Sequence, residues 1–416
     1  MSIKKVMESW KYHFILLFGI GVSNVGAWVY HIALNLIVLD MTGSPLAVTG
    51  LYILKPLATL FTNGWSGSLI DRVNKKHLMV GLNIFQAIFI AFLPLLSSLW
   101  SIYCFVFVIN MASSMFDPTS MTYMTKLIPK GRRKKFNSLR SLIDSGAFLI
   151  GPAIAGLLFM IGTPTYAIYI NAIALFLSGL LISIMPNVEK EGFPKAAQEK
   201  LSFTLMRKDW KLVLDFSRQS VYIMFIYFLF SAVTVMTWGV DSLEAAFAKE
   251  VLYLSDRDYG FLVSIAGAGI LVGSIVNTLF VKKLAISWLI GIGSIILSLG
   301  YIIFSFSNGF LMAAIGCFIL SFSLAFANTG FYTFYQNNIP VDVMGRIGSI
   351  YGLLEAFFII IIMSVCGIMA ELLSIQFVVI SGALIMLLLS ITLFIFNIQP
   401  SKAKFYTVST VNTKGM

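Results

Sequence analysis

Charged side chains are scarce in this 416-residue chain. Asp, Glu, Lys and Arg make up 11% of it and 58% is hydrophobic, whereas a soluble domain carries roughly 25% charged residues. So little polar surface excludes a water-soluble globule. The alternative solvent is lipid, and the chain repeatedly supplies apolar runs of the length, about 20 residues, that a membrane-spanning helix needs.

Residues for covalent or metal chemistry are also rare. The chain has three cysteines and three histidines, and the cysteines lie in apolar runs without forming a motif, which argues against disulfides and paired His/Cys metal centres. There is no Walker loop, no His-Glu-x-x-His and no Gly-x-Ser-x-Gly. An intramembrane enzyme would need a nucleophile and a base, and none is recognisable. We therefore expect no enzyme activity, no metal and no cofactor.

Short polar segments divide the sequence into twelve apolar runs. Helices are the only single-segment structures that satisfy their own backbone hydrogen bonds in lipid, so we predict an all-α membrane protein with twelve transmembrane helices. The runs cover residues 12–39, 45–70, 78–97, 100–126, 138–162, 165–186, 219–248, 258–281, 286–306, 309–336, 347–371 and 375–397.

Lysine and arginine are concentrated in every second segment that connects two apolar runs. One set of termini and loops holds 24 of them, and the other set holds only Lys249 and Arg257. Basic loops stay on the cytoplasmic side because they resist translocation. We therefore expect a multi-pass protein of the inner or plasma membrane with both termini in the cytoplasm.

A single long polar stretch, residues 187–218, follows the sixth run. It separates a predicted N-terminal six-helix half, 1–186, from a C-terminal half, 219–397, and residues 398–416 form a cytoplasmic tail. Its later part mixes bulky apolar and basic residues, which is typical of an amphipathic helix lying on a membrane surface.

The two halves also match each other at a shift of about 211 residues. Ile128-Pro129 pairs with Ile339-Pro340, Lys135 with Arg346, and Asp144 with Glu355. Several matches at one offset indicate a duplicated six-helix unit. Parallel repeats of this kind build transporters whose binding site lies near the midplane, where one half rocks against the other.

The segment Gly67-Ser-Leu-Ile-Asp-Arg-Val-Asn-Lys-Lys76 resembles the signature loop of the major facilitator superfamily, with Asn74 where glycine is usual. The resemblance implies a fold of twelve helices in two pseudo-symmetric six-helix halves. It also implies that Asp71, with Arg72, latches a cytoplasmic gate. A carboxylate at the N-terminus of a helix from the other half is favoured by the helix dipole.

Gly151-Pro152 is similar to the Gly-Pro motif of the exporting, proton-antiporting branches of that superfamily. Together with Phe116-Asp-Pro118, it resembles the drug:proton antiporters that include macrolide and siderophore exporters. Asn110 lies near the place where many drug antiporters have a membrane arginine, so the usual proton-relay arginine is absent. The second copy of the loop motif, Val281-Lys-Lys283, has no acid.

Ionisable residues inside apolar runs are functional candidates, because each costs about 2.5–3.5 kcal/mol at mid-bilayer on insertion scales. We hypothesise that a carboxylate carries the coupled proton, since burial in a cavity lets an acid load and unload protons. The candidates for this role are Asp117, Asp144, Asp241 and Glu355, with His31 as a further titratable group.

Two of these acids have alternative roles. Arg140 and Asp144 are one helical turn apart, so they could form a structural ion pair. Lys55, in the second run, needs an acidic partner, and Glu355 is the one we expect. Glu355 would then be part of a gate and not a proton carrier. Gly151 and Pro152 would bend the fifth helix at the gate.

Four predicted helices carry polar stripes that should line a cavity. On the seventh, Thr234, Thr237, Asp241 and Glu244 are spaced to share one face. Matching residues lie on the first, fourth and tenth helices. The predicted substrate-binding residues are Trp28, Asn35, Phe116, Trp238, Glu244, Asn328 and Tyr332.

These patterns predict a secondary transporter that exports a lipophilic or amphipathic small molecule in exchange for protons. Proton-coupled import of a small solute is the closest alternative, because the fold supports either direction. A lipid-translocating protein would not need the gate motif. The expected partners are the small-molecule substrate, protons and membrane lipids, with no nucleic acid, and we expect a monomer.

Overall fold

The computed structural model describes residues 10–42, 45–161, 163–189, 203–254 and 256–406. The predicted N-terminal segment before Trp10, part of the linker (190–202) and the end of the tail (407–416) lie outside this part. Within it every regular element is helical and no strand occurs, which confirms the all-helical prediction.

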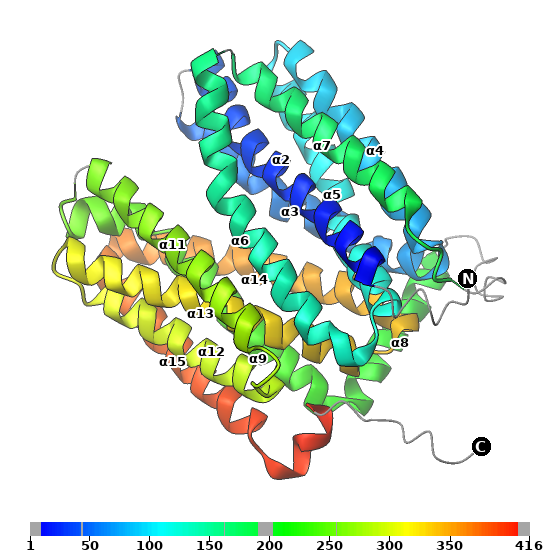
Figure 1. Cartoon of the computed structure of the whole chain (residues 1–416). Coiled ribbons are helices and arrows are strands. Elements are labelled where there is room, and N and C mark those ends of the chain that lie inside the picture. The colour runs from blue at the N-terminus through cyan, green and yellow to red at the C-terminus, as the bar shows by residue number, and fades with distance from the viewer. Residues whose placement is uncertain (1–9, 43–44, 162, 190–202, 255, 407–416) are drawn as a thin grey trace, which may run out of the picture. The chain divides into compact units, whose positions relative to one another are not determined.

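Six long helices precede the linker (Figure 1). They are α2 (Trp10–Thr42), α3 (Pro45–Arg72), α4 (Lys75–Phe92, continued by the short η1, Leu93–Leu95), α5 (Leu99–Leu127), α6 (Lys130–Ile161) and α7 (Pro164–Ile184). The amphipathic helix α8 (Phe203–Gln219) follows in the linker.

The second part of the chain holds six more long helices and several short elements. They are α9 (Val221–Asp241), α10 (Glu244–Ala246), η3 (Phe247–Val251), α11 (Asp256–Phe280), α12 (Ile286–Ser305), α13 (Phe310–Asn338), α14 (Val341–Leu372), α15 (Ile375–Asn397) and η4 (Pro400–Phe405). Ten of the described helices are long and apolar enough to cross a membrane. The other two long helices, α3 and α6, carry Lys55, Arg140 and Asp144.

The chain divides into two compact units. Unit 1 comprises Met1–Pro129, Ile143–Arg218 and Val341–Phe358, and unit 2 comprises Lys130–Leu142, Gln219–Pro340 and Ile359–Met416. The first part of α14 therefore packs in unit 1, and the first part of α6 packs in unit 2. The division into halves at 1–186 and 219–397 stays a prediction, because the start of α6 belongs to unit 2 and the start of α14 belongs to unit 1.

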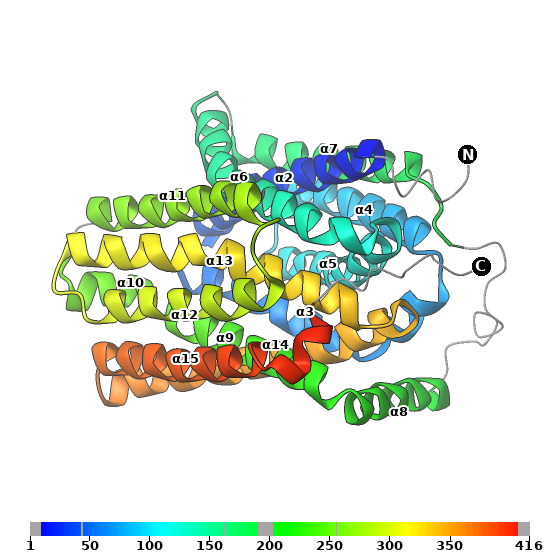
Figure 2. The same ribbon diagram turned by 60° about the horizontal axis from the view of Figure 1, so that its bottom comes forward.

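In unit 1, α2 packs on α7, α7 on α4, and α5 on both α3 and α4. Buried aliphatic side chains such as Val29, Ala33, Ile90 and Ile102 form its core. In unit 2, α13 packs on α11 and α12, and α15 packs on α12 and α9 (Figure 2). Gly269 and Gly273 permit the close α11–α13 contact, because a Cβ at either position would overlap the backbone of α13.

One helix boundary differs from the predicted spans in a way that matters for function. The run 219–248 is not one helix, because α9 ends at Asp241 and Glu244 begins α10 after a turn at Ser242 and Leu243. The Ser242 hydroxyl donates to the Gly239 carbonyl (2.6 Å), which is a local alternative to continuing the helix. Asp241 and Glu244 therefore do not lie on one continuous helix, and their sharing of one face stays a prediction.

Candidate functional site

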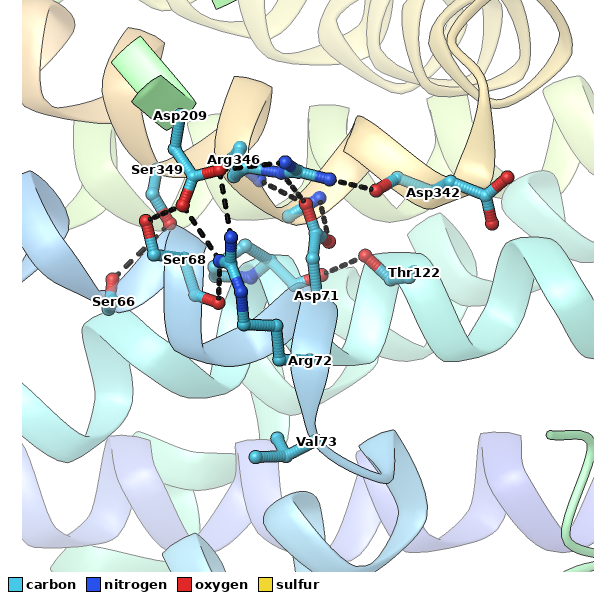
Figure 3. A network of polar contacts seen from close by, with 12 residues as sticks. Ser66, Ser68, Asp71, Arg72, Val73, Thr122, Asp209, Asp342, Arg346 and Ser349 are labelled. Carbon is cyan, nitrogen blue, oxygen red and sulfur yellow. Dashed lines mark hydrogen bonds and ion pairs between the residues drawn. The ribbon is translucent and has the colours of Figure 1, made fainter. Parts of the chain in front are cut away.

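Unit 1 contains an ionic cluster where α3 ends and α14 begins (Figure 3). Asp71, in the last turn of α3, accepts hydrogen bonds from the backbone N–H groups of Gly345 (3.0 Å) and Arg346 (3.1 Å). The Nε of Arg346 also donates to Asp71 (2.7 Å). Only 2% of the Asp71 side chain is exposed. The Asp71 carboxylate thus accepts from two backbone amides near the start of α14 and also pairs with a guanidinium.

A second carboxylate completes the cluster from the linker helix. Asp209 on α8 accepts hydrogen bonds from Ser68 (2.5 Å) and from both terminal nitrogens of Arg72 (2.7 and 3.0 Å). It also accepts from Arg346 (2.9 Å). Arg346 therefore bridges Asp71 and Asp209, and three helices meet around two arginines and two buried acids. Charge-assisted hydrogen bonds of this kind are the strong ones in proteins.

Gly67 lets α3 and α14 approach closely enough for these contacts. A Cβ at position 67 would lie 2.7 Å from the Arg346 Cα and 3.0 Å from the Gly345 carbonyl oxygen. On the same side, the hydroxyls of Ser66 and Ser349 are 3.3 Å apart. The glycine of the signature loop thus has a steric function in addition to its place in the motif.

The loop after Asp71 is held by its own side chains. Lys75 donates to the carbonyls of Asp71 and Val73 (both 3.0 Å) and pairs with Glu189 (3.1 Å). Asn74 has a φ of −67° and its side chain accepts from His77 N–H (3.1 Å). Asn74 therefore caps α4, as asparagine commonly does, and this explains how it replaces the usual glycine.

Two further contacts fasten α8 to unit 1. The indole N–H of Trp210 donates to the Gly64 carbonyl on α3 (3.1 Å), and the hydroxyls of Ser217 and Tyr351 are 2.6 Å apart. Asp209, Trp210 and Ser217 lie along one side of α8, so the helix is docked on α3 and the start of α14 by polar contacts.

The environment of Asp209 also fixes its charge. Burial would raise the pKa of its carboxyl, but the hydrogen bonds from Arg72 and Ser68 and the charge of Arg346 outweigh burial and lower the pKa below 3.8. A lowered carboxyl pKa stabilises the docked form above the ordinary pKa, and that contribution is lost only as the pH falls through the lowered value. Asp209 is therefore charged throughout the physiological range.

We expect Asp209→Asn to loosen α8. A hydrogen bond to a charged group contributes about 1.5–3 kcal/mol, so amide hydrogen exchange in residues 205–217 should accelerate roughly tenfold or more. In the unmodified protein this exchange, corrected for intrinsic rates, should not change between pH 8 and 5. Asp215→Asn is the control, since Asp215 lies on the same helix and outside the cluster. Equal hydrogen-exchange rates in the two variants would show that Asp209 does not hold α8 in place.

A separate polar contact in unit 1 joins α2 and α6. Asn24 donates to Asp144 (2.6 Å), and the ring of Trp28 packs edge-on against Phe148 with centroids 4.8 Å apart. Gly151 faces Trp28 so closely that a Cβ there would overlap it. Asp144, a predicted proton carrier, therefore lies on the same pair of helices as Trp28, a predicted substrate residue.

The other predicted residues of unit 1 are more scattered. His31 is exposed and its ring lies 6.3 Å from that of Trp28, and Asn35 donates to Tyr52 (2.8 Å). Further members of this set are Asp117 and Lys55, which are exposed, and Phe116 and Glu355, which are half-buried. The Lys55–Glu355 pair stays a prediction. Pro152 lies in α6, and its side chain is outside those described.

Unit 2 holds the remaining predicted residues. The Tyr301 hydroxyl donates to Asp241 (2.6 Å), and Trp238 on the same helix is 52% exposed. The guanidinium of Arg140 lies 5.6 Å from the ring centre of Tyr332, a distance at which a cation attracts an aromatic face. Glu244 and Asn328 are half-buried.

The structure thus joins Asp71 and Arg72 in one cluster, Asp144 to the Trp28 region, and Arg140 to Tyr332. Sequence reasoning missed Asp209, Ser68 and the part of Arg346 in the cluster. A signal for Arg346 was present, since it matches Lys135 in the internal repeat. Nothing in the linker sequence singled out Asp209. Among the described residues, no group of three His, Cys, Asp or Glu side chains could hold a metal ion.

The sequence profile of the Major Facilitator Superfamily matches residues 16–363. The chain belongs to this superfamily. It is therefore a multi-pass membrane protein and a secondary transporter, not an enzyme, and the predicted superfamily fold is confirmed.

Among curated members of the superfamily, the uncharacterized MFS-type transporter YfiS of Bacillus subtilis (strain 168) is 25% identical over 403 residues, which are 95% of each chain. Macrolide efflux protein A of Streptococcus pyogenes is 20% identical over 364 residues, 83% of this chain and 86% of that protein.

Solved structures of the superfamily show the same fold. An outward-facing bacterial homologue of the iron transporter ferroportin gives a TM-score of 0.74 at 18% identity, covering 93% of this chain and 99% of that one. The proton:xylose symporter XylE gives 0.68 at 15% identity, covering 93% and 96%.

Proposed function

We propose that this transporter is a proton-coupled exporter of a lipophilic or amphipathic small molecule that works by alternating access. The cluster around Asp71 carries the proposal of alternating access. It ties the start of α14 to α3 and α8 by ionic contacts that can break and re-form, whereas the rest of α14 packs in unit 2. A helix shared in this way moves with one unit or the other, which is how a gate at this end would open.

Export is supported by the resemblance of the Gly151-Pro152 region to exporting branches of the superfamily. It is also supported by similarity to a relative named for macrolide efflux. The basic loops place the Asp71 cluster on the cytoplasmic side under the positive-inside rule, with both termini in the cytoplasm. In this orientation, the cluster holds the start of α14 on α3 and α8 at the cytoplasmic end of unit 1.

Proton coupling is assigned to Asp144 and Asp241, one in each unit. Asp144 accepts a short hydrogen bond from Asn24, and Asp241 accepts one from Tyr301. A carboxylate in the membrane-spanning part of a transporter can gain and lose a proton, which is what such coupling requires. The aromatic side chains of Trp28 and Trp238, on the same helices as Asn24 and Asp241, would contact the apolar part of the substrate. A cationic group on the substrate would compete with the proton for these carboxylates.

A flux assay in inverted membrane vesicles tests this function. With an acidic lumen, vesicles that contain the protein should accumulate a fluorescent lipophilic cation faster than vesicles without it. Asp144→Asn or Asp241→Asn should reduce this gradient-driven rate tenfold or more, because an amide cannot exchange a proton at neutral pH. Protein content and gradient-independent dye binding are the controls.

Three outcomes would contradict the proposal. Accumulation by right-side-out vesicles with an acidic exterior would establish proton-coupled import. Accumulation that does not respond to the gradient would exclude proton coupling. Undiminished stimulation in both variants would show that neither acid carries the coupled proton.

A further inference from the structure

Unit 2 contains a cavity of about 300 Å³ beside the first turn of α6 and the loop before α12. Three lysines line it, namely Lys130 and Lys134 on α6 and Lys282 in the loop after α11. Thr333 and Tyr406 contribute to its wall. Lys130 and Lys282 are exposed, and Lys134 is half-buried.

The described segments of unit 2 around this cavity are rich in lysine and arginine. This end of unit 2 is formed by residues 130–142, 219–230, 275–290, 330–340 and 390–406, which hydrogen bonds and packing bring together. These described segments contain ten cationic side chains and no Asp or Glu. The cations are Lys130, Arg132, Arg133, Lys134, Lys135, Arg140, Lys282, Lys283, Lys402 and Lys404.

The start of α14 in unit 1 and the start of α6 in unit 2 differ in the partners of their basic side chains. At the start of α14, Arg346 meets the carboxylates of Asp71 and Asp209. At the start of α6, Lys134 donates to the Leu284 carbonyl (2.5 Å) and Lys135 to the Thr278 carbonyl (2.7 Å). Backbone carbonyls satisfy donors but do not neutralise charge, and like charges that cluster without counter-charge repel each other.

Two helix N-termini add to the positive potential. The helix α6 begins at Lys130 with no acid in its first turn. The helix α12 begins at Ile286, which also lines the cavity, and Ala285 at its N-cap makes no side-chain cap. First-turn amides and the helix dipole favour anions. Gly131, also at the cavity, leaves open space where a Cβ would be.

We propose that this cavity binds a phosphate group, held by Lys130, Lys134 and Lys282. The favoured source is the headgroup of an anionic phospholipid in the cytoplasmic leaflet, because the basic loops place this end of unit 2 at that surface. Basic pockets between transmembrane helices at the cytoplasmic side suit such headgroups. Free phosphate shares the chemistry and is the other source. The site goes beyond the proposed export function and does not depend on the substrate or the coupled ion.

Native mass spectrometry of the full-length protein in detergent tests the site. We expect one phosphatidylglycerol to be retained, with phosphatidylcholine bound at least tenfold more weakly. The variant carrying Lys130→Gln, Lys134→Gln and Lys282→Gln should bind phosphatidylglycerol at least tenfold more weakly than the unmodified protein. The matched control carries Lys11→Gln, Lys208→Gln and Lys211→Gln, which remove the same charge from unit 1 and should leave the affinity unchanged.

Two further measurements distinguish a phospholipid headgroup from free phosphate and control for misfolding of the triple variant. Gly131→Glu places a carboxylate at the cavity without removing a lysine, and it should also lower the affinity for phosphatidylglycerol tenfold. Inorganic phosphate that protects the unmodified protein against heat, with phosphatidylglycerol inactive, would identify free phosphate as the ligand. Equal affinity of the cavity variants and the control variant for both probes would overturn the proposal.

Discussion

Asp71→Asn is expected to reduce the transport rate at least tenfold without changing the amount of protein in the membrane. Asp71 is almost fully buried and accepts three hydrogen bonds from Gly345 and Arg346. Asparagine removes the charge and points an amide group at a donor. Breaking one partner of a buried ion pair costs about 3–5 kcal/mol, which shifts an equilibrium by roughly a hundredfold or more.

The same variant should loosen the start of α14. Amide hydrogen exchange in residues 342–350 should accelerate together with the loss of transport, because docking of this segment depends on Asp71. The control is Asp342→Asn, since Asp342 is exposed in the first turn of α14 and its side chain points away from Asp71 in Figure 3. Normal transport with accelerated exchange would show that docking of α14 is not part of the cycle.

Gly67→Ala is expected to have a comparably large effect for a steric reason. The new Cβ would lie 2.7 Å from the Arg346 Cα and 3.0 Å from the Ser349 Cβ. Backbone atoms cannot rotate away as a flexible side chain can, so α14 must move off α3 and the contacts of Asp71 are lost with it. We expect transport to fall at least tenfold and exchange at the start of α14 to rise, as in the Asp71 variant.

A nearby glycine provides the matched control. Gly64 lies one turn earlier on α3, and a Cβ there would meet only the side-chain tip of Leu353 at 3.7 Å, an ordinary contact. Gly64→Ala should therefore transport at the normal rate. If both alanine variants lose transport equally, the effect belongs to α3 as a whole and the close approach at Gly67 is not its cause.

The two variants act on one structure, so their effects should not add. Once Gly67→Ala has displaced α14, Asp71 has no partner left to lose. We expect the double variant to transport no more slowly than the slower single variant, since residues in one network are strongly coupled. An additive loss would mean that Asp71 also acts elsewhere in the cycle.

Composition and periodicity alone determined that this chain is an all-helical membrane protein. Lipid offers the backbone no hydrogen-bond partners, so apolar runs of this length can only be helices, and ten of the described helices have the length and hydropathy to span. The loop from Gly67 to Lys76 likewise indicated the superfamily, because its residues are contiguous and their spacing is readable in one dimension.

The tertiary structure alone decided which charges meet. Asp209 is 137 residues from both Arg72 and Arg346, and no local pattern in a mixed basic and apolar linker distinguishes it from Asp215. The break after Asp241 was also invisible in the sequence, since apolar residues continue beyond it. Local composition fixes which segments enter the membrane, but ion pairs depend on three-dimensional proximity, which helix packing creates between residues far apart in the chain.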